Sequence, residues 1–260
     1  MTSYPVLAGL RVGCVKYLNS KPLIHAYPGP VVFEHPSDLA RDIAAGELDV
    51  ALVPVFEALR NPNYAFADGV AISSDGPVYS VFLAHRGPLS EIRTISLDPA
   101  SRTSAHLVQV LLREYHGLSP RCMNAAALDC VPDATLLIGN QAIEFRQRAG
   151  FSDKILDLGE EWKRCTGLPF VYAPWMLRSG LPDPAGAASE LRALKRAGLA
   201  RLPEIIRGET EWEPAFSERY LTHHIRFDLG EREKLGIDKF RELLTKHGLI
   251  PESKKPLIYV

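Results

Sequence analysis

VVFEHPSDLARDIAAGELDVALV, residues 31–53, contains a complete β-α-β pattern. The apolar runs at residues 31–34 and 50–53 have the length of strands. Between them, Ser37 suits a helix N-cap, the apolar residues that follow share one helical face, and a glycine lies near the end. The stretch therefore predicts two parallel strands joined by a crossover helix over residues 37–48.

The alternation of strands and helices continues to about residue 175, which is typical of an α/β fold. Further strands are predicted at residues 11–15, 78–84, 94–97, 134–138 and 170–173, and a further helix at residues 101–115. After Trp175 the sequence predicts helices, at residues 187–199, 203–207, 217–224 and 237–247. We expect two α/β lobes with a cleft between them and a helical C-terminal cover, with lobe 1 formed by residues 1–84 and 176–260 and lobe 2 by residues 85–175.

The composition is that of a globular protein with a large core. The chain has 260 residues, of which 46% are hydrophobic and 23% charged, and a formal net charge of -1. Well-mixed charges of this kind give no electrostatic footprint for a nucleic acid. The first residues lack the pattern of a signal peptide, and no apolar run has the length of a membrane span. We expect a cytoplasmic protein, with neither nucleic acid nor membrane as a partner. No sequence feature indicates an oligomeric state.

The cysteines and histidines do not form metal-binding motifs. The four cysteines form no C-x-x-C pair, and the eight histidines show no H-E-x-x-H spacing. We interpret the cysteines as reduced, partly buried side chains. The sequence predicts no protein-bound metal and no cofactor.

Two stretches place polar groups where a ligand can bind. In VKYLNSKPL, residues 15–23, an apolar strand runs into Tyr17, Asn19, Ser20 and Lys21. Such a stretch is either an ordinary turn or a ligand contact at a strand end. In LDPASRTSAHLVQVLL, residues 97–112, hydroxyls gather at a helix start where an anion is stabilised. Three hydroxyls, at Ser101, Thr103 and Ser104, exceed what N-capping needs and favour anion binding.

Three further sites are open to two interpretations each. Glu57 follows a buried strand, where an acid suits the first turn of a helix or a ligand site. Gly139 and Asn140 end another buried strand, where a glycine permits close approach and an amide offers a donor and an acceptor. The aromatic residues in 157–175 suit either the wall of a ring-binding pocket or plain core packing.

Several common enzyme signatures are missing from the sequence. There is no glycine-rich phosphate loop, no G-x-S-x-G elbow and no closely spaced carboxylate pair. Their absence counts against nucleotide hydrolysis, serine esterase chemistry and glycoside hydrolysis. The residues alone thus predict a two-lobed protein that binds a small anionic ligand.

Six motifs in order resemble the chorismate dehydratase family of the futalosine route to menaquinone. They are YLNSKPL, DVALVP with Glu57, GPVYSVFL, SRTS, DATLLIGN and DLGEEWKRCTGLPFVYAPW. The resemblance implies a fold like that of type II periplasmic binding proteins. It also implies a hydro-lyase that converts chorismate into 3-[(1-carboxyvinyl)oxy]benzoate. The related dihydroxynaphthoate synthases lack the Tyr-Leu-Asn stretch at residues 17–19.

The resemblance also implies roles for individual residues. Asn19 is the implied catalytic residue, touching the substrate near its reacting carbons. Ser20 and Lys21 are implied to fix the loop or a carboxylate, and Ser80, Ser101, Thr103 and Ser104 to receive a carboxylate. Tyr17, Phe170 and Trp175 are implied to form an apolar wall. Asn140 is also expected to bind the substrate, and Glu57 is a further candidate.

The sequence departs from the family at two places. Asn140 stands where the family usually has an aspartate, and Phe56 precedes Glu57 where a small polar residue is common. If the aspartate is the essential base, this chain is impaired, whereas asparagine can replace an acid that only bonds to a hydroxyl. A non-catalytic protein that binds a small carboxylate is therefore an alternative, as is the sister synthase.

Overall fold

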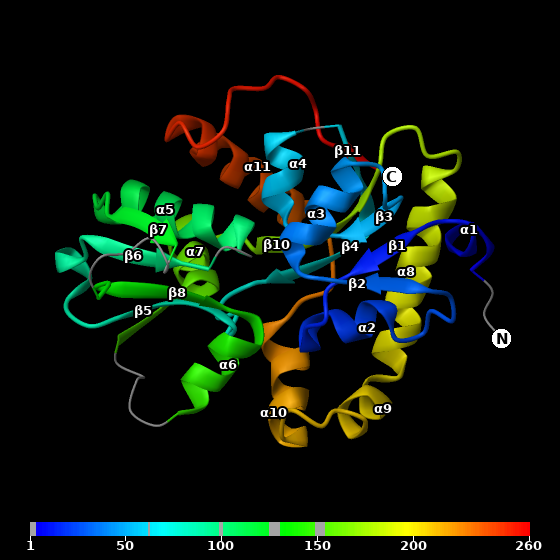
Figure 1. The fold of residues 1–260 in the computed structure, drawn as a ribbon, viewed down its shortest axis with the longest axis horizontal. Helices are drawn as coiled ribbons and strands as arrows, with labels where there is room; N and C mark the ends of the chain where they lie inside the picture. Colours follow the sequence, from blue (N-terminus) through cyan, green and yellow to red (C-terminus); the bar gives the residue numbers. More distant parts are fainter. Residues whose placement is uncertain (1–3, 62, 99–100, 125–130, 149–153) are drawn as a thin grey trace.

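Two β-sheets, each flanked by helices, build the molecule. The computed structural model describes residues 4–61, 63–98, 101–124, 131–148 and 154–260. The sheets lie side by side (Figure 1), with strand orders β11-β4-β10-β3-β1-β2 and β7-β6-β8-β5-β9. The two-lobed α/β fold class expected from the sequence is confirmed. None of the helices in the described ranges is long and apolar enough to cross a membrane.

The first sheet contains the β-α-β unit with which the sequence analysis began. Strands β2 (Val31–Phe33) and β3 (Val50–Leu52) both run parallel to β1 (Val12–Cys14), which lies between them, and α3 (Pro36–Ala44) makes the crossover. The carboxyl ends of β1 and β3 therefore meet at one edge of the sheet, where ligands settle in open α/β folds.

The rest of the first lobe consists of three further strands and the helices that flank the sheet. Strand β10 (Phe170–Leu177) runs antiparallel to β3 and β4 (Ala65–Ser74), and β11 (Ile258–Tyr259) runs parallel to β4. The remaining helical elements are α1 (Pro5–Ala8), a 3-10 turn (Leu18–Ser20), α2 (Lys21–Ile24), α4 (Val55–Arg60), α8 (Pro184–Ala200), α9 (Leu202–Arg207), α10 (Pro214–Arg219), a π-helical turn (Tyr220–His224) and α11 (Glu231–Lys246).

The second lobe has its own sheet and helices. Strands β7 (Arg121–Asn124) and β8 (Ala134–Ile138) run parallel to β6 (Thr94–Leu97), whereas β5 (Val81–His85) runs antiparallel to β8 and β9 (Ile155–Asp157). A 3-10 turn (Leu89–Glu91), α5 (Arg102–His116), α6 (Gly139–Gln147) and α7 (Leu158–Thr166) complete the lobe.

Sheet membership revises the expected lobe boundaries. The division expected at residues 84/85 and 175/176 cuts through β5 and β10, yet all of β5 belongs to the second sheet and all of β10 to the first. The chain has therefore reached the second lobe before β5 begins, and it has returned to the first lobe before β10 begins. We therefore propose that the chain crosses between the lobes at residues 75–80 and 167–169.

The buried carboxylate of Asp157 holds the first crossing. It accepts hydrogen bonds from the backbone N–H groups of Val78 (3.0 Å) and Tyr79 (2.9 Å), and it pairs with Arg146 (3.1 Å). The same side chain caps α7 by accepting from the N–H of Gly159. Tyr79 has a φ of +69°, which is rare for a bulky residue and persists only when the surroundings impose it. Asp157 therefore fixes the crossing in a strained conformation.

Three adjacent strands of the first sheet are joined at one edge by Asp49. Its carboxylate, 8% exposed, accepts from the backbone N–H (2.9 Å) and Nε (3.0 Å) of Arg11 and from Nε of Arg178. Arg11 precedes β1, Asp49 precedes β3 and Arg178 follows β10. The hydrogen bonds from Arg11, with the one from Arg178, hold the pKa of Asp49 well below its ordinary value of 3.8.

We expect Asp49→Asn to lower the free energy of unfolding by about 1–2 kcal/mol near pH 7, because the arginines are partly exposed and water screens the pair. A folded-state pKa below 3.8 means that the carboxylate stabilises the fold above that pH and that this contribution is lost as the pH falls through the folded pKa. Urea unfolding near neutral pH and at about pH 3 measures the difference. A difference that does not shrink in acid contradicts the assignment.

Candidate functional site

A cavity of roughly 630 Å³, counting the space at its mouth, lies between the two lobes. Its lining consists of Val15, Tyr17, Asn19, Pro36, Leu52, Pro54, Ile72, Val78, Ser80, Val81, Ser101, Arg102, Thr103, Ser104, Ile138, Gly139, Tyr172 and Ala173. The cavity thus joins the ends of β1 and β3 to the first crossing, the start of α5 and the end of β8.

Seven of the residues that the sequence singled out meet in this cavity. They are Tyr17, Asn19, Ser80, Ser101, Thr103, Ser104 and Gly139. The other residues singled out lie around it, and their placement follows from the hydrogen bonds and packing described below.

The hydroxyl groups lie at the start of α5, one end of the cavity. Ser101 is the N-cap residue, and its Oγ is buried and has no hydrogen-bond partner among the described residues. Thr103 Oγ1 is already engaged, since it accepts from the N–H of Phe56 (3.3 Å) and donates to the carbonyl of Tyr172 (3.3 Å). The first turn of a helix also presents backbone N–H groups that no intrahelical carbonyl accepts. This end of the cavity is therefore suited to a carboxylate.

Arg102 is the only fully charged side chain among the described lining residues. Its Nε lies 3.6 Å from Oε1 of Glu57, whose other oxygen binds Arg60 at 2.7 Å. Glu57 is buried and does not line the cavity. Its carboxylate instead holds Arg102 at the mouth, so the electrostatics of the cavity favour an anion.

The loop after β1 carries Asn19 into the cavity. The hydroxyl of Ser20 lies 2.6 Å from the carbonyl of Val15 and 2.8 Å from that of Tyr17, which fixes the loop. Lys21 pairs with Glu209 at 2.6 Å. Neither Ser20 nor Lys21 lines the cavity. Their contacts fit the loop-fixing role implied for them.

Asn19 itself contacts a residue that the sequence analysis missed. Its Nδ2 donates to the hydroxyl of Tyr220 (3.2 Å), which also lies 2.7 Å from Oγ of Ser80. The other amide atom of Asn19, Oδ1, is buried without a partner among the described residues. Tyr220 is 201 positions from Asn19, in a helical segment with no motif of its own, so no local sequence signal pointed to it.

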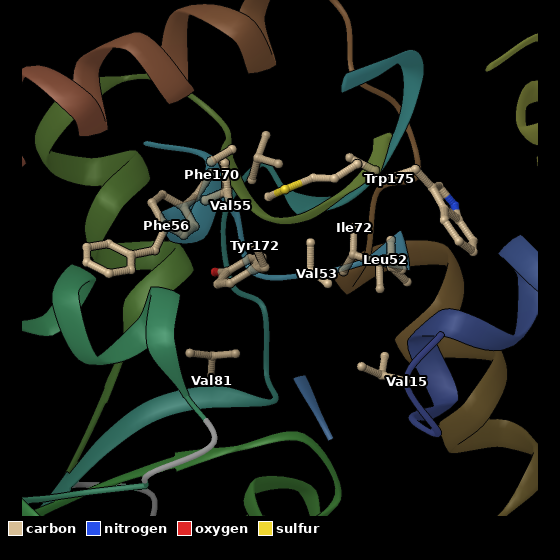
Figure 2. Packing of buried hydrophobic residues seen from close by; sticks show 14 of the residues in the cluster. Val15, Leu52, Val53, Val55, Phe56, Ile72, Val81, Phe170, Tyr172 and Trp175 are labelled. Carbon is tan, nitrogen blue, oxygen red and sulfur yellow. The ribbon is translucent and has the colours of Figure 1, made fainter. Parts of the chain in front are cut away.

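Of the three residues expected to form the apolar wall, only Tyr17 lines the cavity. Figure 2 shows Tyr172, Ile72 and Leu52 facing the region bounded by Val81 and Val15, and all five line the cavity. Phe170 and Trp175 do not line it, which corrects the expected apolar wall. Phe170 packs edge-on against Trp162 and Phe240 in the core, and Trp175 is fully buried.

The register of β10 is irregular beside the cavity. The pairing of β10 with β4 is irregular between Val171 and Ala173. Irregularities of this kind interrupt the alternation of side chains and re-aim them. As a result Tyr172 and Ala173, adjacent in sequence, both line the cavity.

Asn140 lies beside the cavity and connects the lobes. Its Nδ2 donates to Glu211 (2.8 Å), which precedes α10 in the first lobe, and Figure 1 shows α6 and α10 next to each other. Asn140 is not part of the cavity lining. An aspartate at this position would face the carboxylate of Glu211, so asparagine suits this contact.

Tyr17 is the aromatic residue that packs on Gly139. Burial and the nearby carboxylate of Asp98 raise the pKa of Tyr17, so its phenol stays protonated at neutral pH. Gly139 has a φ of +59°, and a Cβ there would lie 3.0 Å from the Tyr17 ring. Its N–H donates to the carbonyl of Ser80 (2.9 Å). The glycine therefore permits both the backbone turn and the close contact.

We expect Gly139→Ala to destabilise the fold more than Gly117→Ala. Both glycines adopt a left-handed backbone conformation, in which an alanine lowers the free energy of unfolding by about 1–2 kcal/mol. Gly117 has a φ of +65°, and nothing lies within 4 Å of the methyl group that an alanine would add, so this backbone strain is its whole cost. Gly139→Ala must in addition displace the Tyr17 ring. Urea unfolding of both variants measures the difference, and equal losses of stability contradict the packing role.

No group of three histidine, cysteine or acidic side chains in the described part of the chain is arranged to hold a metal ion.

Comparisons of the whole sequence with known proteins give consistent results. Residues 10–246 match a family described as "Menaquinone biosynthesis". A chorismate dehydratase of Thermus thermophilus is 30% identical, over 90% of this chain and 94% of its own length. A chorismate dehydratase of Campylobacter jejuni is 26% identical over 60% of this chain and 58% of its own, and a 1,4-dihydroxy-6-naphtoate synthase of Streptomyces coelicolor is 29% identical over 55% and 51%.

Solved structures similar to this one share its fold at low sequence identity. A protein of Archaeoglobus fulgidus superposes with a TM-score of 0.66 and 18% identity over 93% of this chain and 98% of its own. A Candida albicans protein described as having the generic periplasmic binding protein fold superposes with a TM-score of 0.62 and 12% sequence identity. The match covers 94% of this chain and 92% of that protein. The periplasmic aliphatic sulphonate binding protein of Escherichia coli superposes with a TM-score of 0.56 and 14% sequence identity, over 94% of each chain. These likenesses bear on the fold alone.

Proposed function

Because this chain belongs to the menaquinone biosynthesis family, we propose that it is a hydro-lyase that removes water from chorismate. The product is then 3-[(1-carboxyvinyl)oxy]benzoate, and the reaction is a step of the futalosine route to menaquinone. The relative that spans nearly the whole chain is a chorismate dehydratase, whereas the naphtoate synthase matches only about half. This difference favours the dehydratase over the sister enzyme.

The observation that carries the proposal is the division of the cavity into a polar end and apolar walls. Chorismate is a dianion with a small unsaturated ring. One carboxylate is received by Ser101, Ser104 and the backbone N–H groups at the start of α5, with Arg102 supplying positive charge. The ring then lies against Tyr172, Tyr17 and the aliphatic walls. In this pose the reacting carbons face Asn19 and Ser80, the polar lining residues that remain.

The reaction requires the loss of one proton and one hydroxyl from neighbouring ring carbons. The C–H bond breaks at the carbon that bears the enolpyruvyl ether, its electron pair forms a ring double bond, and the C–O bond to the neighbouring hydroxyl breaks. The products are the aromatic ether and water, so atoms and charge balance. Aromatisation supplies the driving force, and the enzyme has to lower the barrier by holding the geometry.

No described residue of the lining carries a carboxylate or an imidazole that could take the proton. We therefore assign the base to the enolpyruvyl carboxylate of the substrate, which reaches the proton through a compact ring. Asn19 and Ser80 orient this group and assist the departure of the hydroxyl. Positioning of this kind contributes on the order of 7 kcal/mol or more when the reacting groups are well aligned.

A non-catalytic protein that binds a small carboxylate is the second candidate. The observation in its favour is the same absence of an acid-base side chain from the described lining, together with Asn140 at the edge of the cavity. The two candidates differ in what they do to chorismate and are separated by one experiment.

We expect the purified protein, incubated with chorismate without added metal or nucleotide, to release the dehydrated aromatic ether. Chromatography with mass detection measures the product, which is lighter than chorismate by one water. Chorismate that stays intact contradicts the lyase. In that case Asn140→Asp distinguishes a binding protein, which stays inactive, from an enzyme disabled at this position, which gains activity.

We expect Arg102→Gln to raise the KM for chorismate roughly ten-fold with little change in kcat, because a partly exposed charge is removed from the carboxylate end of the cavity. Arg60→Gln is the matched control, since Arg60 also binds Glu57 but does not line the cavity. Steady-state kinetics of both variants test the assignment. An equal rise in KM for the two variants shows that the Glu57 cluster, not contact with the substrate, causes the effect.

A further inference from the structure

We propose that Tyr220 is a positioning residue that sets the orientation of Asn19 and Ser80 for the dehydration. The inference rests on the proposed function and adds to it a residue of the C-terminal segment, outside the cavity lining. Its basis is one phenolic oxygen that contacts both polar residues at the reacting side of the cavity, 3.2 Å from Asn19 Nδ2 and 2.7 Å from Ser80 Oγ.

One direction in this group is fixed and the other is inferred from it. Asn19 Nδ2 is a donor, so the oxygen of Tyr220 accepts from it. Either hydroxyl can donate in the contact between Tyr220 and Ser80, and we infer that Tyr220 donates its proton to Ser80 Oγ, because its oxygen already accepts from Asn19. Two groups remain free to act on the substrate: Oδ1 of Asn19 as an acceptor and the hydroxyl proton of Ser80 as a donor. Tyr220 thereby determines which atom each residue offers.

This order depends on Tyr220 staying protonated. The side chain is 1% exposed, and burial raises the pKa of its phenol above the ordinary value, although the contacts with Ser80 and Asn19 oppose the shift. Tyr220 is therefore neutral at neutral pH. It orients its neighbours through hydrogen bonds and does not serve as the base.

The surroundings of Tyr220 hold it rigidly. Its ring stacks on Phe216 at 5.7 Å with an interplanar angle of 13°, and Phe216 in turn contacts Tyr79 at 5.3 Å. Tyr220 also opens a π-helical turn, a distortion frequent at functional sites. On the other side, Ser80 follows the strained Tyr79 that Asp157 fixes. The two partners of the contact are thus each held by packing before a substrate arrives.

We expect Tyr220→Phe, which removes the hydroxyl and keeps the ring, to lower kcat about 10- to 100-fold with a much smaller change in KM. In the Asn19→Ala background the same substitution should lower kcat several-fold less, because one of its two partners is already absent. A merely structural role predicts equal losses in both backgrounds. Steady-state kinetics with chorismate on the four proteins gives the comparison.

A second measurement requires no turnover. In ¹⁵N-labelled protein, the side-chain amide signals of Asn19 are identified as the pair missing from the Asn19→Ala spectrum. We expect this pair to shift in Tyr220→Phe and to stay in place in Tyr27→Phe. Tyr27 is a suitable control, because its hydroxyl is also buried but donates to a different group, the carbonyl of Leu7, at 2.9 Å. The control also measures the general cost of deleting a buried tyrosine hydroxyl.

The outcomes separate this inference from the proposed function. An active wild type whose kcat survives Tyr220→Phe overturns the inference alone, as do additive losses with Asn19→Ala or an unmoved Asn19 amide signal. A wild type that leaves chorismate intact overturns the proposed function, whatever the amide signal does. A selective loss of kcat, smaller in the Asn19→Ala background, with a shifted amide signal supports both.

Discussion

The hydrogen bonds of Asp157 are the constraint on which the rest of the site depends. One buried carboxylate binds the N–H groups of Val78 and Tyr79, pairs with Arg146 and caps α7. The first crossing between the lobes is therefore part of the rigid second lobe. Because Ser80 follows directly, its hydroxyl has a fixed place relative to the start of α5 and to Gly139. The first lobe contributes Asn19, and Tyr220 joins the two.

Charge is unevenly distributed among the polar groups of the cavity. The start of α5 and Arg102 form the end that attracts an anion, while Asn19, Ser80 and Tyr220 form a neutral polar end. Neutral groups attract a carboxylate of the bound substrate only weakly, so this carboxylate can approach the proton on the neighbouring carbon. The same division explains why a binding-protein fold, with two lobes around an anion, can also support a reaction that needs no strong protein base.

Local patterns were sufficient to predict those parts of the structure whose residues are close in sequence. The β-α-β unit at residues 31–53 and the hydroxyl cluster at Ser101 each lie within one continuous stretch and have clear periodicity or capping chemistry. Strand β4 was missed because Asp68 and Gly69 interrupt its apolar pattern, and Gly69 adopts a positive φ. Strands β7, β9 and β11 are short or polar, so they give little signal of their own.

The candidate site was harder to predict, because its details depend on irregular geometry and on distant residues. The aromatic wall was placed at Phe170 and Trp175 by resemblance to the family, whereas in the structure Tyr172, at the irregular register of β10, lines the cavity. The contact between Asn19 and Tyr220 spans 201 positions, and no spacing rule connects residues so far apart. The family resemblance supplied the loop that carries Asn19, but not the partner that orients it.

The hydroxyl of Thr103 has a consequence for the release of product. It ties the start of α5, in the second lobe, to the N–H of Phe56 and the carbonyl of Tyr172 in the first, through two contacts of 3.3 Å. Contacts of that length are at the weak end of hydrogen bonding, each worth about 1 kcal/mol or less. The stacked rings of Phe56 and His106 and the pair of Arg102 with Glu57 join the same two segments. Release of a product through the anion end of the cavity therefore requires more than the loss of the two Thr103 contacts, if the lobes are to separate there.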